Sequence, residues 1–143
     1  MSRPNAYWDS TALIPLCVAQ PQSARAKLLY ESYGIVAWGA TQVEIMSGLT
    51  RLERMGEISR HGFLAGKRIA EVLVQSWYST GTDSIANDAC LLLERYPLRA
   101  ADALQLAAAL EACDHKPQSF VFVTADQRLA DAARKTGFSI EFI

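Results

Sequence analysis

The sequence has little of what marks several protein classes. Its 14 Lys and Arg residues are balanced by 15 Asp and Glu, so the formal net charge is −1 and the chain is not a globally basic nucleic-acid binder. The sequence contains neither the apolar run of a signal peptide nor one approaching the ~20 residues of a membrane span. We therefore expect a soluble, cytoplasmic protein without membrane association, in which any nucleic-acid site is a local patch.

Cysteine and histidine are also scarce. The three cysteines, Cys17, Cys90 and Cys113, are far apart and set in apolar helical patterns, which is typical of small buried hydrophobes in a reducing compartment. The two histidines, His61 and His115, stand in no zinc-ligand spacing with them. With 143 residues, 50% of them hydrophobic, the chain can form one proper core, so we expect a single domain over residues 1–143.

Short apolar stretches alternate with helical ones along the chain. Strands are predicted at residues 5–8, 35–38, 119–123 and 140–143, separated by helical patterns. Uniformly apolar strands suit a parallel sheet that is covered on both faces and joined by crossover helices. The pattern predicts an α/β fold with a parallel sheet of about four to five strands flanked by helices.

Proline and glycine predict where elements end. Pro15 should interrupt the first helix, and Gly34 and Gly137 should end the helices before them. A turn is expected at residues 55–59, between two long helices, and another at residues 80–83.

Carboxylates stand at the junctions between strands and helices. Asp9 and Asp126 directly follow strands, Glu44 follows one within a turn or two, and Asp102 lies in the first turn of an otherwise nearly apolar helix. The carboxyl ends of parallel strands share one edge of the sheet, where ligands bind at the switch in strand order. We therefore expect these four side chains to face one crevice.

Each acid also has a purely structural explanation. Asp9 suits an N-cap, and residues 41–44 and 124–127 match the capping-box pattern. Asp102 is spaced to pair with Arg99 and is favoured by the helix dipole. A cap needs only a polar oxygen, however, and four neighbouring negative charges repel one another, so the set favours a bound cation. Carboxylate oxygens without His or Cys select Mg²⁺ or Mn²⁺.

One stretch is locally basic. Residues 51–68 carry five Lys or Arg against two acids, and the candidates for contacting nucleic-acid phosphates are Arg51, Arg54, Arg60 and Lys67. A solvated helical hairpin with ordinary surface charges explains the same pattern equally well.

The four acids lie in four motifs, which are DSTAL at 9–13, VE at 43–44, LRAADALQLA at 98–107 and VTAD at 123–126. Together these motifs resemble the PIN domain, and most closely the VapC-like toxins of bacterial toxin-antitoxin pairs, over nearly the whole chain. Within the third motif, Ala101 and Gln105 look like ordinary variants.

The resemblance implies a metal-dependent endoribonuclease, a hydrolase that is often a homodimer and is held inactive by a cognate antitoxin. The residues that would hold Mg²⁺ or Mn²⁺, and so activate a water to hydrolyse RNA phosphodiesters, are Asp9, Glu44, Asp102 and Asp126. Residues placed to orient a water or ligand, or to balance the acids, are Ser10, Thr124 and Arg99.

Two functions of other classes are alternatives. A catalytically inert PIN-like binding module would keep the fold and bind a partner without cutting RNA, although the presence of all four acids argues against it. A receiver-type signalling domain would have paired acids early in the chain and a Lys after the last core strand, and the sequence has neither.

Overall fold

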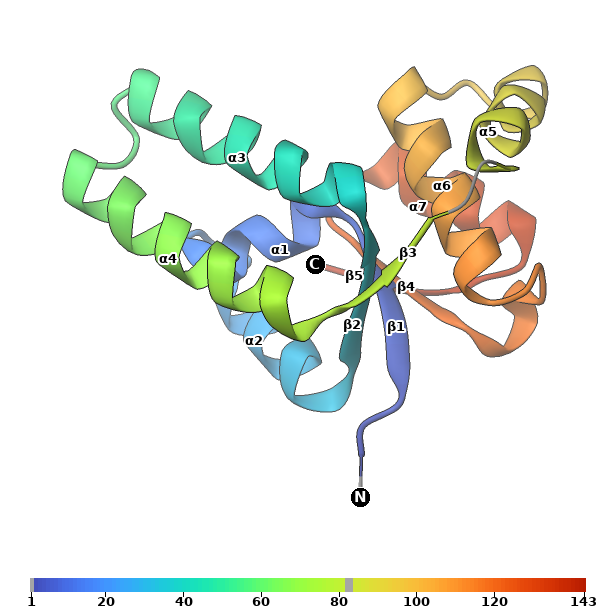
Figure 1. Ribbon diagram of the computed structural model, residues 1–143, viewed down its shortest axis with the longest axis horizontal. Coiled ribbons are helices and arrows are strands. Elements are labelled where there is room, and N and C mark those ends of the chain that lie inside the picture. Colours follow the sequence, from blue (N-terminus) through green and yellow to red (C-terminus); the bar gives the residue numbers. More distant parts are fainter. Residues whose placement is uncertain (1, 82–83) are drawn as a thin grey trace.

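The computed structural model describes residues 2–81 and 84–143, which form an α/β domain around a five-stranded sheet. All neighbouring strands pair in parallel, in the order β3-β2-β1-β4-β5 (Figure 1). The strands are β1 (Asn5–Trp8), β2 (Gly34–Trp38), β3 (Tyr78–Thr80), β4 (Val121–Thr124) and β5 (Ser139–Phe142). The predicted fold class is confirmed.

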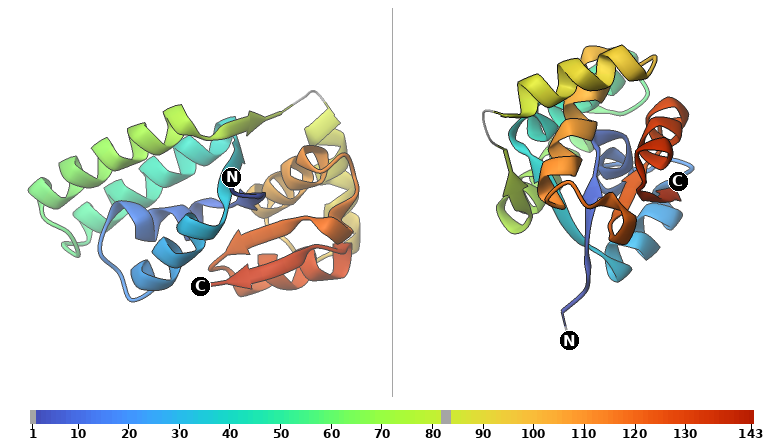
Figure 2. Two further views of the ribbon diagram at one scale, coloured as in Figure 1. Left: turned by 90° about the horizontal axis from the view of Figure 1, so that it is seen from below. Right: turned by 90° about the vertical axis from the view of Figure 1, so that its right-hand side faces the viewer.

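Helices cover both faces of this sheet. They are α1 (Ser10–Cys17), α2 (Ser23–Ser32), α3 (Gly39–Arg54), α4 (Arg60–Ser76), α5 (Ser84–Arg95), α6 (Ala100–Ala112), the 3-10 helix η1 (Pro117–Ser119) and α7 (Gln127–Thr136). Helices α1 to α4 lie on one side of the strands and α5 to α7 on the other, and the α3-α4 hairpin extends away from the sheet (Figure 1 and Figure 2). None of the helices within the described residues is both long and apolar enough to cross a membrane.

The central strand β1 contributes to two hydrophobic cores. Ala6 and Trp8 face the core under α1 to α4, whereas Tyr7 faces the core under α5 to α7, and all three side chains are fully buried. The Tyr7 ring packs against Phe122 of β4 with 5.4 Å between the ring centroids. Burial of each large apolar side chain contributes about 1.5–3 kcal/mol to the stability of the fold. This packing fixes the positions of β1 and β4, and so of the residues that follow them.

Two glycines let the helical hairpin approach α1 closely. A Cβ atom at Gly48 of α3 would lie 2.4 Å from Ile14 Cδ1, and Gly66 of α4 packs on the end of α1 in the same way. A side chain at either position would force a neighbour to shift. Glu44, one turn before Gly48, is therefore held near the start of α1, where Asp9 lies.

The proline and glycine predictions have mixed outcomes. Pro15 does not interrupt α1, which continues to Cys17, because the missing N–H costs one hydrogen bond in a helix that ends within a turn anyway. Gly34 is the first residue of β2, paired with Asn5, and α2 ends two residues earlier. Gly137 does end α7, with a φ of 121° that favours glycine.

The edge strand β3 is absent from the sequence prediction. Thr80 belongs to it, and the rest of the expected turn at 80–83 includes residues 82 and 83, which lie outside the described residues. A strand of three residues containing Ser79 and Thr80 has no apolar run to reveal it; it forms by pairing with β2. The turn at 55–59 is confirmed.

Candidate active site

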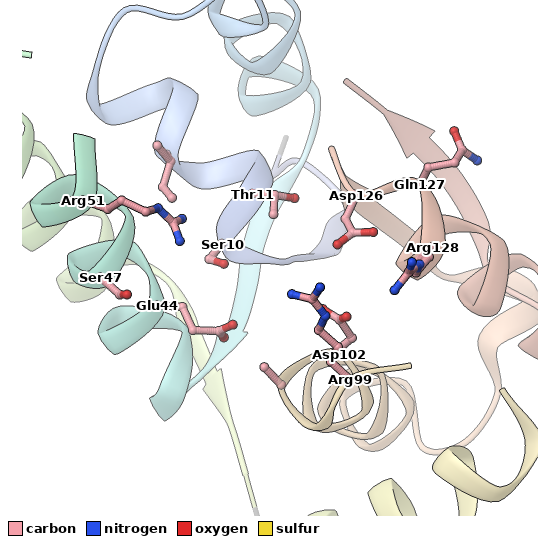
Figure 3. Close-up of a pocket in the computed structure, with 12 residues that line it drawn as sticks. Ser10, Thr11, Glu44, Ser47, Arg51, Arg99, Asp102, Asp126, Gln127 and Arg128 are labelled. Atoms are coloured by element: carbon pink, nitrogen blue, oxygen red, sulfur yellow. The ribbon is translucent and has the colours of Figure 1, made fainter. Parts of the chain in front are cut away.

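A cleft of about 680 Å³ opens at the carboxyl edge of the sheet, between α1 and α3 on one side and α6 and α7 on the other (Figure 3). Glu44, Asp102 and Asp126 line it, and Asp9 lies buried beside it at the end of β1. Strands β2 and β3 lie on one side of β1, and β4 and β5 on the other, so the cleft occupies the switch point of the sheet. The four acids expected to share a crevice come from four different elements around it.

Asp9 occupies the N-cap position of α1, yet among the described residues its side chain makes no capping hydrogen bond. Its two carboxylate oxygens accept instead from Thr11 Oγ1, at 2.8 and 3.0 Å. Burial raises the pKa of Asp9 to about 7; the hydroxyls of Thr11 and Thr124 oppose this rise, and the charges of Asp126 and Glu44 add to it. The N-cap position therefore explains the backbone conformation of Asp9, but it does not explain why a carboxylate is buried there.

Glu44 does not belong to a capping box. Helix α3 begins after Trp38, which is its N-cap, so Thr41 and Glu44 both lie inside the helix and Thr41 is fully buried. The Glu44 carboxylate accepts a hydrogen bond from Gln105 Nε2. Burial raises the pKa of Glu44, the bond from Gln105 lowers it, and the charge of Asp102 raises it further.

Asp102 lies in the first turn of α6, where it meets both acids and bases. Burial and the charge of Asp126 raise its pKa, while Arg99 and Arg128 lower it. No ion pair between Arg99 and Asp102 occurs in the described part of the chain; Arg99 lowers the pKa of Asp102 first through a backbone hydrogen bond and then through its charge. The pKa of Asp102 stays raised overall.

Asp126 is the true N-cap of α7. Its carboxylate accepts from Leu129 N at 3.1 Å, and its own N–H donates to Thr124 Oγ1 at 3.0 Å. The predicted capping box at 124–127 is therefore wrong, because the helix starts two residues later than that pattern requires. The Thr124 hydroxyl also lies 3.3 Å from the Thr11 hydroxyl, which joins the end of β4 to the first turn of α1.

Basic and hydroxyl groups complete the cleft. Ser10 lines it, and so do Arg51 from α3, Arg99 and Arg128. In Figure 3, Arg51 extends toward Ser10 from one wall, and Arg99 and Arg128 lie on the opposite side. Both walls of the cleft therefore carry cations and carboxylates together (Figure 3).

The remaining members of the basic stretch lie outside this cleft. Arg60 pairs with Glu53 at 3.2 Å, and its guanidinium stacks on Phe63. Lys67 lines a separate hollow of about 100 Å³ between α3 and α4, and Arg54 is exposed in the last turn of α3. The structure therefore brings one residue of the predicted patch, Arg51, to the acids.

The acids surround the cleft without meeting at one point. Across residues 2–81 and 84–143, no three His, Cys, Asp or Glu side chains lie close enough together to hold one ion. Burial and mutual repulsion nevertheless raise the pKa of Asp9, Glu44 and Asp102, and a nearby cation relieves this repulsion. Oxygen donors around an open cleft fit a hard divalent cation that keeps several of its waters.

Sequence reasoning missed three residues of this region: Thr11, Gln105 and Arg128. Thr11 follows Asp9 by two residues, and Gln105 is one helical turn beyond Asp102 in a helix that is otherwise nearly apolar. The isolated polarity of Gln105 was a usable signal. Arg128 had none, since an Arg in the first turn of a helix is ordinary.

The sequence profile of the PIN domain matches residues 6–135. The chain belongs to the PIN domain family. PIN domains typically are metal-dependent nucleases, and the family usually binds divalent metals. No curated protein matches this chain significantly.

Three solved structures have a fold similar to that of this chain. PAE2754 from Pyrobaculum aerophilum superposes with a TM-score of 0.67 at 19% identity, covering 96% of this chain and 89% of its own. A toxin-antitoxin complex from Klebsiella pneumoniae gives 0.64 at 18%, covering 88% and 91%. FitAcB from Neisseria gonorrhoeae gives 0.64 at 14%, covering 96% of each chain. At these identities the likeness is one of fold.

Proposed function

We propose that this PIN domain is a metal-dependent endoribonuclease and the toxin of a toxin-antitoxin pair. One observation carries the nuclease proposal: three carboxylates from separate elements line a single open cleft, and a fourth, Asp9, is buried beside it, where among the described residues its side chain neither caps its helix nor meets a cation. A fold has no structural reason to bury such a charge, because an unpaired buried carboxylate destabilises it.

In this proposal the ligands of one or two Mg²⁺ or Mn²⁺ ions are Asp9, Glu44, Asp102 and Asp126. When bound, such a cation lowers the pKa of a water molecule and neutralises charge on the phosphate. Thr11 holds the Asp9 carboxylate from both oxygens, and Thr124 fixes the backbone of Asp126. Ser10, at the cleft surface, is positioned to orient a water or a phosphate oxygen.

The RNA backbone would cross the cleft between its basic walls. Arg51 lies on one wall and Arg99 and Arg128 on the other, so phosphates on both sides of the scissile bond meet a guanidinium, which suits phosphate geometry. Arg99 also tempers the acid charge near Asp102. Arg54, Arg60 and Lys67 lie outside the cleft, and we propose that they contact phosphates of the same RNA molecule farther from the scissile bond.

The toxin assignment has a separate support. The fold is similar to that of a toxin-antitoxin complex from Klebsiella pneumoniae, and the sequence motifs resemble VapC-like toxins. We propose on this basis that a cognate antitoxin binds the chain and that the chain forms a homodimer.

The test of the nuclease function is RNA cleavage by the purified chain, free of any antitoxin. We expect cleavage with Mg²⁺ or Mn²⁺ and none with EDTA. If a water attacks the phosphorus, the products carry a 5′-phosphate, and one 2′-deoxy substitution at the scissile nucleotide leaves the reaction intact. Cyclic phosphate ends would show attack by the ribose 2′-hydroxyl and would overturn the mechanism. A chain that binds RNA with Mg²⁺ but leaves it uncut would support the inert binding module instead.

A further inference from the structure

Gln105 is a polar side chain in the apolar interior of α6. It is 1% exposed, and its neighbours Leu106 and Ala107 are fully buried. A buried amide costs free energy unless its donors and acceptor find partners, so an amide in such a place has specific hydrogen bonds to explain it.

Those hydrogen bonds join three elements. The Tyr7 hydroxyl, from β1, donates to Gln105 Oε1. Gln105 Nε2 donates to the Glu44 carboxylate and, at 3.2 Å, to Thr41 Oγ1, both from α3. The amide of Gln105 therefore connects the central strand to a carboxylate on the wall of the cleft.

The chemistry of the partners gives this amide one orientation. An ionised Glu44 only accepts hydrogen bonds, so it requires the NH₂ end of the amide. The Tyr7 hydroxyl, which donates, is then matched by the carbonyl end. If the amide turned over, a carbonyl oxygen would face a carboxylate, with no proton between them. Glu44 therefore sets the orientation of the amide, and the Tyr7 hydroxyl, which can donate or accept, donates to the carbonyl end that this orientation presents.

We propose that Gln105 is a positioning residue that holds the Glu44 carboxylate toward the cleft for cation binding, and that Tyr7 acts through Gln105. The inference rests on the proposed function. A neutral donor suits this role better than any charged one. A Lys or Arg at position 105 would neutralise Glu44 and repel the cation, whereas an Asp or Glu there would repel the Glu44 carboxylate. An apolar residue would leave both Tyr7 and Glu44 without this partner.

The test compares three single variants and the double variant Tyr7→Phe/Gln105→Met. Gln105→Met keeps the length of the side chain but removes the amide, Tyr7→Phe removes only the hydroxyl, and Leu106→Met is a matched control in the same buried turn of α6. Mn²⁺ affinity is measured by calorimetry on the metal-free protein, and RNA cleavage is measured separately. Partners that orient metal ligands typically contribute about 10- to 100-fold in metal affinity or activity, and we expect a loss of that size for Gln105→Met.

Tyr7→Phe should lose less, because Gln105 remains in place with one anchor gone. It should also have no further effect on Mn²⁺ affinity in the Gln105→Met background, since in this proposal Tyr7 affects the Glu44 carboxylate through Gln105. Leu106→Met should bind Mn²⁺ and cleave RNA as the wild type does.

The outcomes separate the two levels of the proposal. If wild type binds Mn²⁺ and cleaves RNA, and Gln105→Met does both equally well, Gln105 is only a partner for Tyr7 and the inference is overturned alone. Additive effects of Tyr7→Phe and Gln105→Met overturn the link between them. A wild type that neither binds Mn²⁺ nor cleaves RNA overturns the proposed function and the inference with it. If Gln105→Met does not fold, the Mn²⁺ affinity of Tyr7→Phe decides.

Discussion

The β1-α1 and β4-α7 junctions have the same backbone arrangement, but the Asp side chains at the two junctions make different hydrogen bonds. Trp8 pairs with Val123 in adjacent parallel strands, and each strand leads to an Asp at the N-cap of the next helix. The carboxylate of Asp126 accepts from a backbone N–H of its helix, whereas that of Asp9 is held by a threonine hydroxyl.

This difference separates two reasons for an acid at a helix start. Asp126 has structural work in the folded chain, so its presence alone does not indicate chemistry. Asp9 destabilises the metal-free fold, since burial raises its pKa to about 7. Asp9, whose side chain caps no helix, therefore indicates a cation site more strongly than Asp126, whose side chain does.

The largest expected effect is the loss of RNA cleavage in Asp9→Asn. The partners of metal ligands contribute about 10- to 100-fold, so removal of a proposed ligand charge should reduce the rate by more than about 100-fold. Asp126→Asn should lose cleavage as well, although Asn caps a helix as well as Asp does. The control is Asp131→Asn, which removes an exposed carboxylate from the same helix and should cleave normally. Normal cleavage by Asp9→Asn would remove Asp9 from the site.

A smaller effect is expected in the pH dependence of stability without metal. The pKa of Asp9 is about 7 in the folded chain, against about 4 in an unfolded one. Between these values the folded state keeps a proton that the unfolded state releases, so the free energy of unfolding in EDTA should fall as pH rises from about 4 to 7. Each unit of pKa difference corresponds to about 1.4 kcal/mol.

Melting curves in EDTA between pH 5 and 8 measure this directly. Asp9→Asn should lack much of the decline and should melt above wild type at pH 8. Added Mg²⁺ should stabilise wild type more at pH 8 than at pH 6, because it competes with the proton for the same carboxylate. Identical pH slopes for wild type and Asp9→Asn would contradict the assignment of the raised pKa.

The smallest effect concerns the cap itself. Asp126→Ala removes the acceptor for Leu129 N and should cost about 1 kcal/mol in EDTA, whereas Asp126→Asn should cost little, since it keeps an acceptor. Urea unfolding at fixed pH distinguishes them. Equal stabilities of Asp126→Ala and Asp126→Asn would mean that the two junctions do not differ as described.

Much of the fold was predictable because the main strands are apolar runs between recognisable breakers. The placement of the four acids around one cleft also followed from a general rule, the shared edge of parallel strands. The N-cap position of Asp9 was predictable, but the capping boxes expected at 41–44 and 124–127 do not form. The pattern of Thr41 and Glu44 matches a capping box, but it does not indicate at which residue β2 ends and α3 begins. In the structure α3 begins earlier, with Trp38 at its N-cap.

Long-range partners were the other limit. Gln105 meets Tyr7 at a separation of 98 residues and Glu44 at a separation of 61, and no local pattern contains such a pair. Its polarity within α6 indicated that a partner exists but not which one. Likewise β3 became a strand through its neighbour β2 and not through its own three residues.

Gly48 connects helix packing to the space open to a substrate. Ile14, which a Cβ at position 48 would meet at 2.4 Å, also lines the cleft. A single methyl group on α3 would therefore force the Ile14 side chain, and with it this part of the cleft lining, to shift. The shape of the cleft lining at Ile14 thus depends on an atom that glycine lacks, at a position that carries no charge.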